Sequence, residues 1–375
     1  MDSLSSICEF SNRLKGVAGV EPRALASPEP PGSHHRLSRY KNKTERPLAS
    51  GSSSLLAIIL LGYTALSPVL IAAEHSVQRA RSFEFEYAAS IIDLTPGKTA
   101  RVWIPIPQAD DNQDVKVLSS GFPTNTQAGR DEQFGNSMLY FEAQADGAGE
   151  ISFSSKYRVR RKEVRAHDEI ANKAVLSQRH RTHFLRPNAL VPVDSRPLVL
   201  LQGQVLPNDP MKLARHLYDL VDDHVAYDKS KPGYGNGDSA WVCDSRYGNC
   251  TDFHSLFISL ARARGLPARF EIGFPLPPER GQGSVTGYHC WAYFYVEQQG
   301  WIPVDISEAD KHPDQKEYYF GNLTENRLAF SVGRDVTLVP RQDGPPLNYF
   351  IYPYVEVDGR LWPKEKMKLE FSYAD

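Results

Sequence analysis

The spacing of apolar residues changes along this chain, and the change limits the folds that it can adopt. From Phe83 onward apolar and polar side chains alternate, with Phe83, Phe85 and Tyr87 on one face of an extended segment. Similar segments recur near residues 101–105, 138–141 and 151–159, between breaks rich in Gly, Pro, Asn and Asp. Short alternating segments with such breaks are typical of antiparallel sheets. We therefore expect a β-sandwich domain over residues 80–165.

Beyond a polar linker around residues 163–200 the apolar period becomes helical. Asp209 followed by Pro210 has the form of a helix cap and a first helical residue. A second helical stripe follows Cys250, with apolar residues at helix spacing: Phe253, Leu256, Phe257, Leu260 and Ala261. Strands followed by helices predict an α+β fold. We expect a second domain over residues 195–345, with strands in residues 346–375 that pack on its core.

The first 75 residues have the composition of a targeting segment rather than of a folded domain. Residues 1–50 are rich in Ser, Pro, Arg and Lys without any apolar period, which predicts a disordered N-terminal extension. Basic residues at 36–46 then precede an apolar run at residues 55–73, the order found in secretory signals. The run is also about long enough to span a bilayer. Residues 51–75 are therefore interpreted as a signal peptide or signal anchor. We expect an exported, periplasmic or extracytoplasmic protein, with association to the membrane through residues 55–73 as the alternative to cleavage.

The charge balance argues against one broad class of partner. The chain has 43 Lys and Arg against 45 Asp and Glu, a net charge of −2 at pH 7. Domains that bind nucleic acids are usually strongly basic, so we expect no nucleic-acid partner. Four cysteines in 375 residues are also too few for a fold built on disulfides.

One cysteine lies where a reactive thiol would be placed. Gly248 and Asn249 supply a tight entry to the helix, so Cys250 falls in its first turn. Unpaired backbone N–H groups and the positive end of the helix dipole favour a thiolate there and lower the thiol pKa. Because the thiolate is the nucleophilic form, this position suits a catalytic cysteine.

A nucleophilic cysteine needs a base and a group that orients the base. His289 opens the β-prone segment 289–296, and Asp305 ends the segment 301–305 that returns from it. The two would be directly opposite only if the hairpin turn centred on residue 297, whereas Gln299 and Gly300 indicate a centre one or two residues later. The spacing therefore permits a Cys-His-Asp triad, provided that a bulge or bend closes the remaining offset.

Four ordered motifs together resemble the transglutaminase-like superfamily, most closely its exported bacterial members. They are GNCTDF at residues 248–253, RGLPAR at 264–269, HCW at 289–291 and GWIPVD at 300–305. The resemblance runs from about residue 83 to residue 359. It implies a papain-like core preceded by an antiparallel β domain, with Cys250 as nucleophile, His289 as base and Asp305 as its partner. It implies no cofactor. Cys290 departs from the pattern, since a small residue such as Ala is more usual there.

Aromatic residues near the cysteine have two readings. Trp241 and Tyr247 could wall the acyl site or help to stabilise an oxyanion, or they could simply pack. His254 competes with His289 as the base, because it lies one helical turn from Cys250. The glycine-rich segment 233–237 is expected to be a mobile loop at the mouth of the site.

The clustered cysteines leave other chemistry open. Cys243, Cys250 and Cys290 could join His254 and His289 in a zinc site, but Cys243 and Cys250 lack the spacing of a zinc knuckle. We therefore expect no metal. In an oxidising compartment Cys243 could pair with Cys290, or with Cys250 as an inhibitory disulfide.

These observations predict a thiol-dependent acyl-transfer enzyme that acts on carboxamides of a protein or peptide substrate. The thioester on Cys250 would pass to an amine, or to water in a cysteine peptidase or amidase. A non-catalytic envelope binding protein that keeps the fold is the alternative from another class.

Overall fold

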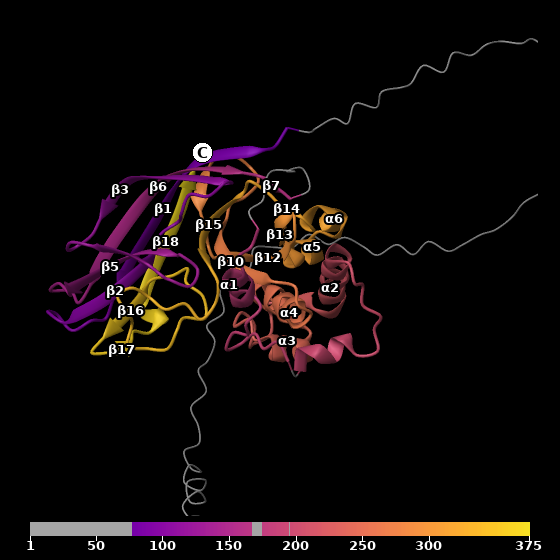
Figure 1. Ribbon diagram of the computed structural model, residues 1–375. Helices are drawn as coiled ribbons and strands as arrows, with labels where there is room; N and C mark the ends of the chain where they lie inside the picture. The colour runs from indigo at the N-terminus through magenta and orange to yellow at the C-terminus, as the bar shows by residue number, and fades with distance from the viewer. Residues whose placement is uncertain (1–76, 167–174, 195) are drawn as a thin grey trace, which may run out of the picture. The chain divides into compact units, whose positions relative to one another are not determined.

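Two five-stranded antiparallel sheets form a sandwich at one side of the computed structural model, which describes residues 77–166, 175–194 and 196–375 (Figure 1). The first sheet has the order β11 (Gln282–Ser284), β18 (Met367–Ala374), β1 (Ala80–Ile91), β6 (Ile151–Lys162) and β3 (Gln113–Gly121). The second has the order β17 (Arg360–Leu361), β16 (Tyr354–Val357), β2 (Thr99–Pro105), β5 (Ser137–Gln144) and β4 (Gln127–Arg130). Phe141 of β5 and Phe153 of β6 meet between the sheets, with ring centroids 5.5 Å apart.

The other side of the molecule is a four-stranded antiparallel sheet with helices against it (Figure 1). Its order is β13 (Gly300–Val304), β12 (His289–Val296), β10 (Ala268–Pro275) and β15 (Arg327–Val332). Short strand pairs flank it, β14 (Asn322–Leu323) with β7 (Val164–Arg165), and β8 (Ala226–Tyr227) with β9 (Tyr247–Gly248). This mixture of helices and antiparallel sheets confirms the predicted α+β fold.

The central helix of this half is α4 (Cys250–Ala263), which is buried over almost its whole length against β12 and β10. Around it lie α2 (Pro210–His224), α3 (Ser239–Ser245) and α5 (Ile306–Lys311), with α1 (Gln178–His183) and α6 (Lys316–Tyr319) farther out. Three short 3₁₀ helices complete the described elements: η1 (Arg196–Leu201), η2 (Pro313–Gln315) and η3 (Lys364–Lys366). As predicted, Asp209 caps α2 by accepting the N–H of Lys212 at 2.9 Å, and Pro210 is the first helical residue.

The C-terminal strands contact both halves of the molecule. We expected residues 346–375 to pack on the core of the second domain, and Phe371 of β18 lies 4.5 Å from the ring of Phe274 on β10. The same segment also adds strands to the sandwich, because β18 pairs with β1 and β16 pairs with β2. The sandwich therefore takes strands from both ends of the described chain. The physical reason is that the long strand β1 would otherwise leave an open edge with unpaired backbone groups.

The division into domains at residues 80–165 and 195–345 stays a prediction, because the described residues belong to one compact unit. An aromatic cluster joins the two halves. Phe85 of β1 lies 5.1 Å from the ring of Phe274 on β10 and 6.1 Å from that of Phe330 on β15. The sandwich and the helical half therefore share one hydrophobic core.

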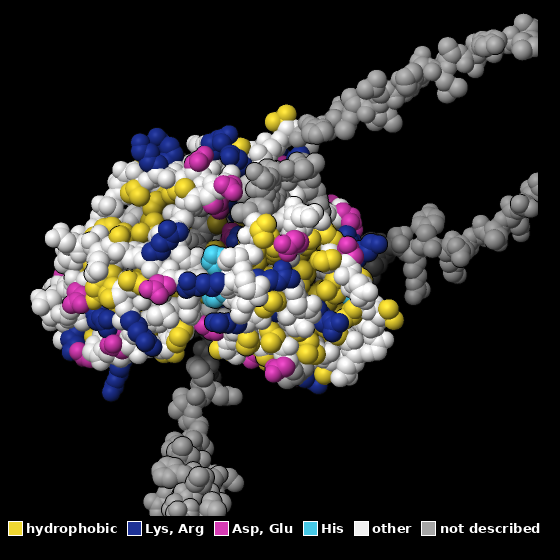
Figure 2. All heavy atoms as spheres, viewed as in Figure 1, with side chains coloured by type: hydrophobic (Ala, Val, Ile, Leu, Met, Phe, Trp, Pro, Cys, Tyr) yellow, Lys and Arg dark blue, Asp and Glu magenta, His cyan; other side chains and the backbone are white. Residues whose placement is uncertain are grey.

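The predicted N-terminal extension at residues 1–50 and the signal or anchor at 51–75 lie outside the described residues. Within the described ranges, none of the helices combines the length and apolar content needed to cross a bilayer. On the face drawn in Figure 2, basic and acidic side chains are interspersed rather than gathered by sign.

We predict that Phe85→Ala lowers the free energy of unfolding by about 3–5 kcal/mol, because it empties a fully buried position in the shared core. Urea denaturation followed by circular dichroism measures the change. Val117→Ala on β3 is the control, since Val117 is 55% exposed and should shift the value by less than about 0.5 kcal/mol. A loss in Phe85→Ala of less than about 1 kcal/mol would mean that the contacts of Phe85 with Phe274 and Phe330 contribute little to stability.

Candidate active site

The start of α4 is built around Cys250, its first residue. Asn249 caps the helix, and its side chain accepts the N–H of Thr251 at 2.9 Å. Asp252 reaches back to accept the N–H of Asn249 at 2.9 Å, which completes a capping box. The thiol of Cys250 is therefore held at the positive end of the helix dipole, although its residue is only 3% exposed.

His289 and Asp305 meet beside this helix end, although they are not opposite each other in the sheet. The β12–β13 register pairs Val296 with Gly300 and Ala292 with Val304, so the turn centres on residue 298. The strand pairing ends at Val304, and Asp305 leaves the sheet as the cap of α5. Its Oδ2 then lies 2.7 Å from Nε2 of His289. This bend closes the offset that the sequence left open.

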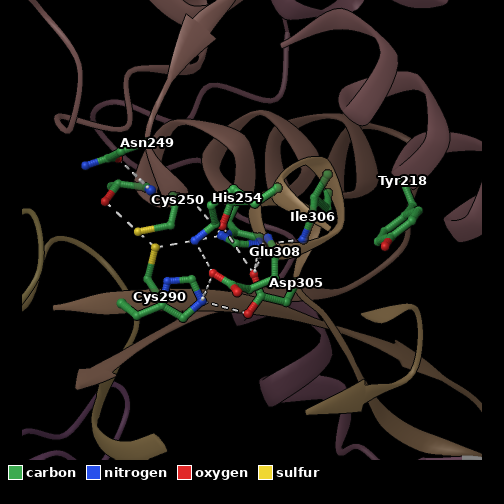
Figure 3. A network of polar contacts seen from close by, with 12 residues as sticks. Tyr218, Asn249, Cys250, His254, Cys290, Asp305, Ile306 and Glu308 are labelled. Atoms are coloured by element: carbon green, nitrogen blue, oxygen red, sulfur yellow. Dashed lines mark hydrogen bonds and ion pairs between the residues drawn. The ribbon is translucent and has the colours of Figure 1, made fainter. Parts of the chain in front are cut away.

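The imidazole of His289 has one ring nitrogen for each neighbour. Nε2 contacts Asp305 at 2.7 Å, which leaves Nδ1 to face Cys250. A hydrogen bond between the His289 and Cys250 side chains contributes to the pKa of both groups. Figure 3 shows Cys250, Asp305 and Glu308 gathered around one point between α4 and the sheet. The structure thus brings together the three residues that the sequence singled out.

Charge pairing outweighs burial at His289. Burial by itself lowers the pKa of His289, but the negative charge and hydrogen bond of Asp305, with a further contribution from Cys250, raise it to about 10. Burial by itself also raises the pKa of the Cys250 thiol. Hydrogen bonds from Cys290 and His289, and the positive charge of His289, nevertheless hold that pKa well below 9.0. The surroundings of the two side chains therefore favour the ionised form of each, the thiolate of Cys250 and the imidazolium of His289.

Arg327 is a residue of this site that the sequence analysis missed. Its Nη1 lies 2.7 Å from Oδ2 of Asp305, the oxygen that also binds His289. Both charged groups are buried, and Asp305 is 0% exposed. Although burial opposes ionisation, the charges of His289 and Arg327 hold the pKa of Asp305 well below its usual value. Arg327 lies on β15, 22 residues after Asp305 in the sequence, and no local motif identifies it as a residue of the site.

His254 is not placed to act as the base. Its Nδ1 is 2.7 Å from the carbonyl oxygen of Cys250, an acceptor, so Nδ1 carries the proton. Its Nε2 accepts the backbone N–H of Ile306 at 3.1 Å. Burial lowers the pKa of His254. A neutral ring with both nitrogens engaged joins the start of α4 to the start of α5, and it has no lone pair left for a substrate proton.

The glycine-rich loop at residues 233–237, which we expected to be mobile, is held by several hydrogen bonds in the structure. Asp252 accepts the N–H of Gly235 at 2.7 Å and that of Gly237 at 2.9 Å. Buried Arg334 donates to the carbonyl oxygens of Asn236 and Gly237, both at 2.9 Å. Two buried charged residues therefore anchor this loop beside the cap of α4. Neither anchor was identified from the sequence.

Trp241 and Tyr247 pack against each other near the same loop. Their ring centroids lie 5.3 Å apart in an edge-to-face arrangement. The Tyr247 hydroxyl donates to the carbonyl oxygen of Pro232 at 2.9 Å, and Gly233 lies directly over the Trp241 ring. The hydroxyl of Tyr247 is thus already engaged by the loop. The pair supports the loop wall, and a role towards an oxyanion stays a prediction.

The three cysteines in the described residues are free and buried. Cys243 lies on α3, where its thiol contacts the carbonyl oxygen of Arg196 at 3.8 Å. Cys290, by contrast, contacts Thr251 and His254 on α4. Cys243 therefore does not join the other two cysteines in the zinc cluster or in the disulfides that the sequence left open.

A different group offers donor atoms that could hold a metal: His289, Asp305 and Glu308, whose ligand atoms lie within 4.8 Å of one another. These atoms already have cationic partners, however. Asp305 pairs with Arg327, and Glu308 pairs with Lys311. A divalent ion would have to displace or face these positive charges, which disfavours metal binding by this group.

We predict that the alkylation rate of Cys250 by iodoacetamide rises far less between pH 6 and pH 9 than that of Cys243, because hydrogen bonds and the charge of His289 hold the pKa of the Cys250 thiol well below its usual value. Peptide mapping by mass spectrometry separates the sites. Cys243 is an internal control, since burial raises its pKa and its rate should climb steeply over the same range. A Cys250 rate that climbs as steeply as that of Cys243 would exclude an activated thiol.

We predict that Asp305→Ala lowers the free energy of unfolding by about 3–5 kcal/mol at pH 7, because it leaves the buried Arg327 without its partner. The pKa of Asp305 in the folded protein lies well below its unfolded value of about 3.9, so its contribution is present above that value and is lost as the pH falls through the folded pKa. Denaturation at pH 7 and in acid measures the difference between the variant and the wild type. Asp314→Ala, at an exposed position, is the control. A loss no larger than that of the control would show that Arg327 does not depend on Asp305.

Comparison with known proteins finds similarity over part of this chain. Residues 201–306 match the model of the transglutaminase-like superfamily. An uncharacterized protein of Haemophilus influenzae is 33% identical over 183 residues, which cover 40% of this chain and 50% of that protein. The chain therefore spans about half the length of this curated relative.

Two solved structures are similar at low identity. One, named as a "Putative Cysteine Protease" from Cytophaga hutchinsonii, is 15% identical with a TM-score of 0.49, covering 80% of this chain and 93% of its own. The other is the periplasmic domain of TgpA from Pseudomonas aeruginosa, 20% identical with a TM-score of 0.32, covering 64% and 75%. The residues that match the transglutaminase-like superfamily model, 201–306, contain Cys250, His289 and Asp305.

Proposed function

We propose that this protein is a thiol acyltransferase that moves the acyl group of a protein or peptide carboxamide onto an amine through Cys250. The observation that carries the proposal is the contact of His289 with both Asp305 and Cys250, at the start of a helix. A thiolate, a protonated imidazole and a carboxylate stand in the order that acyl transfer needs.

In the first half of the reaction, the thiolate of Cys250 attacks the carboxamide carbon. The resulting oxyanion would accept the backbone N–H of Cys250, since an N–H in the first turn of a helix has no acceptor within the helix. His289 then gives its Nδ1 proton to the leaving nitrogen as the C–N bond breaks. The products are ammonia and a thioester on Cys250, and His289 is left neutral.

In the second half, an amine attacks the thioester carbon and His289 takes a proton from it. The C–S bond breaks, and the thiolate–imidazolium pair is restored. Asp305 holds the ring by Nε2 throughout, so Nδ1 is the nitrogen that exchanges the proton. Arg327 keeps Asp305 ionised, which prevents the proton from settling on the carboxylate.

Burial favours transfer over hydrolysis. Cys250 is 3% exposed, His289 is 6% exposed and Asp305 is fully buried. Such a site admits little bulk water to compete with a bound amine for the thioester. A cysteine peptidase or amidase would use the same thioester with water as the acceptor, and the assay below separates the two.

The place of action is part of the proposal. A basic segment followed by the apolar run at residues 55–73 supports export, either with cleavage or with retention at the membrane. We propose a periplasmic or other extracytoplasmic location, where envelope proteins and peptides would supply the carboxamides. Neither a nucleic acid nor a cofactor is part of the proposed reaction.

We predict that the protein incorporates a fluorescent primary amine into peptides that carry carboxamide side chains, and that ammonia is released in equal amount. Cys250→Ala should lower both signals by at least about 10³-fold, because it removes the nucleophile. Cys243→Ala is the matched control, since Cys243 lies on α3 away from the triad. The assay uses mass spectrometry for the peptide and an enzyme-coupled readout for ammonia.

Other outcomes of this assay contradict the proposal in distinct ways. Ammonia release without amine incorporation, lost in Cys250→Ala, would indicate a hydrolase. Equal signals in the wild type and Cys250→Ala would exclude thiol catalysis. Partner binding that is unaffected by Cys250→Ala, without any turnover, would favour a binding protein that only retains the fold.

A further inference from the structure

A second buried thiol touches the nucleophile. Cys290 follows His289 on β12 and is fully buried, and its sulfur lies 3.8 Å from Oγ1 of Thr251 and 3.7 Å from Nδ1 of His254. The Cys290 and Cys250 side chains are also close enough that a hydrogen bond between them contributes to the pKa of both thiols. Figure 3 shows the two labelled cysteines approaching each other from the sheet and from α4. This contact has no part in the reaction described above.

The surroundings decide which of the two sulfurs carries the proton. Cys250 faces the imidazolium of His289. The nearest histidine to Cys290 is the neutral His254, whose Nδ1 proton is already donated to a carbonyl oxygen. Burial, together with the hydrogen bond and negative charge of Cys250, raises the pKa of Cys290 well above 9.0. The negative charge therefore belongs to Cys250, and Cys290 keeps its S–H.

That single S–H has two acceptors within reach, the sulfur of Cys250 and Oγ1 of Thr251. Hydrogen bonds to an ionised acceptor are stronger than those to a neutral one, so the thiolate is favoured while it exists. Thr251 does not depend on Cys290, because its hydroxyl also lies 2.9 Å from the hydroxyl of Tyr288. The S–H can therefore turn from one acceptor to the other without leaving a buried group unpaired.

We propose that Cys290 is a positioning residue that donates its S–H to the thiolate of Cys250, stabilises the charged nucleophile, and turns to Thr251 once Cys250 is acylated. The first part concerns the free enzyme and needs no substrate. The second part rests on the proposed acyl transfer. No bond between heavy atoms forms or breaks, and the proton stays on Cys290 throughout.

Other ionisable groups face the same thiolate and must be considered in any pH profile. The charge of His289 favours the thiolate, with Asp305 acting through His289, whereas His254 is neutral because its Nε2 accepts a backbone N–H. The remaining groups are neutral or negative, and they affect the pKa of Cys250 equally in the wild type and in the variants described below. They are Asp252 on α4, Tyr227 on β8, Tyr288 before β12, and Tyr349 and Tyr352 before β16.

The test is the pH profile of Cys250 alkylation by iodoacetamide in the full chain, mapped by mass spectrometry, for the wild type, Cys290→Ala and Cys290→Ser. We expect Cys290→Ala to raise the midpoint by about one pH unit, so that alkylation is about tenfold slower on the acid side. At a pH above both midpoints, where the thiolate is fully formed in both proteins, the same variant should react as fast as the wild type or faster, because an unbonded thiolate is the better nucleophile. Cys290→Ser keeps a donor and should hold the midpoint at or below that of the wild type.

The outcomes separate this proposal from its alternatives. An unchanged midpoint in Cys290→Ala would overturn it, and so would an equal rise in Cys290→Ala and Cys290→Ser, which would indicate packing alone. If Cys290→Ala does not fold, Cys290→Ser still decides, because a raised midpoint with a hydroxyl donor in place contradicts the proposal. Cys243→Ser is the control for loss of a buried thiol elsewhere. A wild-type midpoint near 9 would instead contradict the proposed function itself.

Discussion

The buried carboxylate of Asp305 is the constraint on which the rest of the site depends. A charge without access to water must be paired and hydrogen-bonded, and one oxygen of Asp305 meets both His289 and Arg327 at 2.7 Å. The same side chain caps α5 by accepting the N–H of Glu308. One residue therefore joins β12, β15 and α5. The orientation of His289, and through it the state of Cys250, follows from this arrangement.

Charges alternate in sign through the site and each supports the next. Arg327 favours the ionised form of Asp305, Asp305 favours protonated His289, and His289 favours the thiolate of Cys250. Burial opposes the charged form of each of these groups. The ionised state exists because the partners are close and water is excluded, and excluded water strengthens the attraction between charges. The last group in this series is the S–H of Cys290, which is an uncharged donor.

Much of the site could be predicted because its signals are local. The glycine and asparagine before Cys250 mark a helix start, and alternation around His289 marks a strand. The sequence predicted Asp305 near His289 but not directly opposite it in the hairpin. The remaining offset is closed by the bend after Val304, which arises because Asp305 caps α5. Arg327, Asp252 and Arg334 escaped notice, since a buried charge has no sequence signature until its partner is known. The pairing of β18 with β1 joins strands almost 300 positions apart, which no periodicity can register.

By itself, then, the sequence determined the α+β class, the helix start that holds the thiol, and the order of the three motifs, because these depend on neighbours within a few residues. Only the tertiary structure decided which histidine serves the cysteine. His254 is nearer to Cys250 in sequence, but both of its ring nitrogens are hydrogen-bonded to backbone groups. His289 binds Asp305 through one ring nitrogen, and the other is available to Cys250. It also placed Cys290 against the nucleophile. Such choices depend on hydrogen-bond partners supplied by distant segments, and these are defined only once the core has closed.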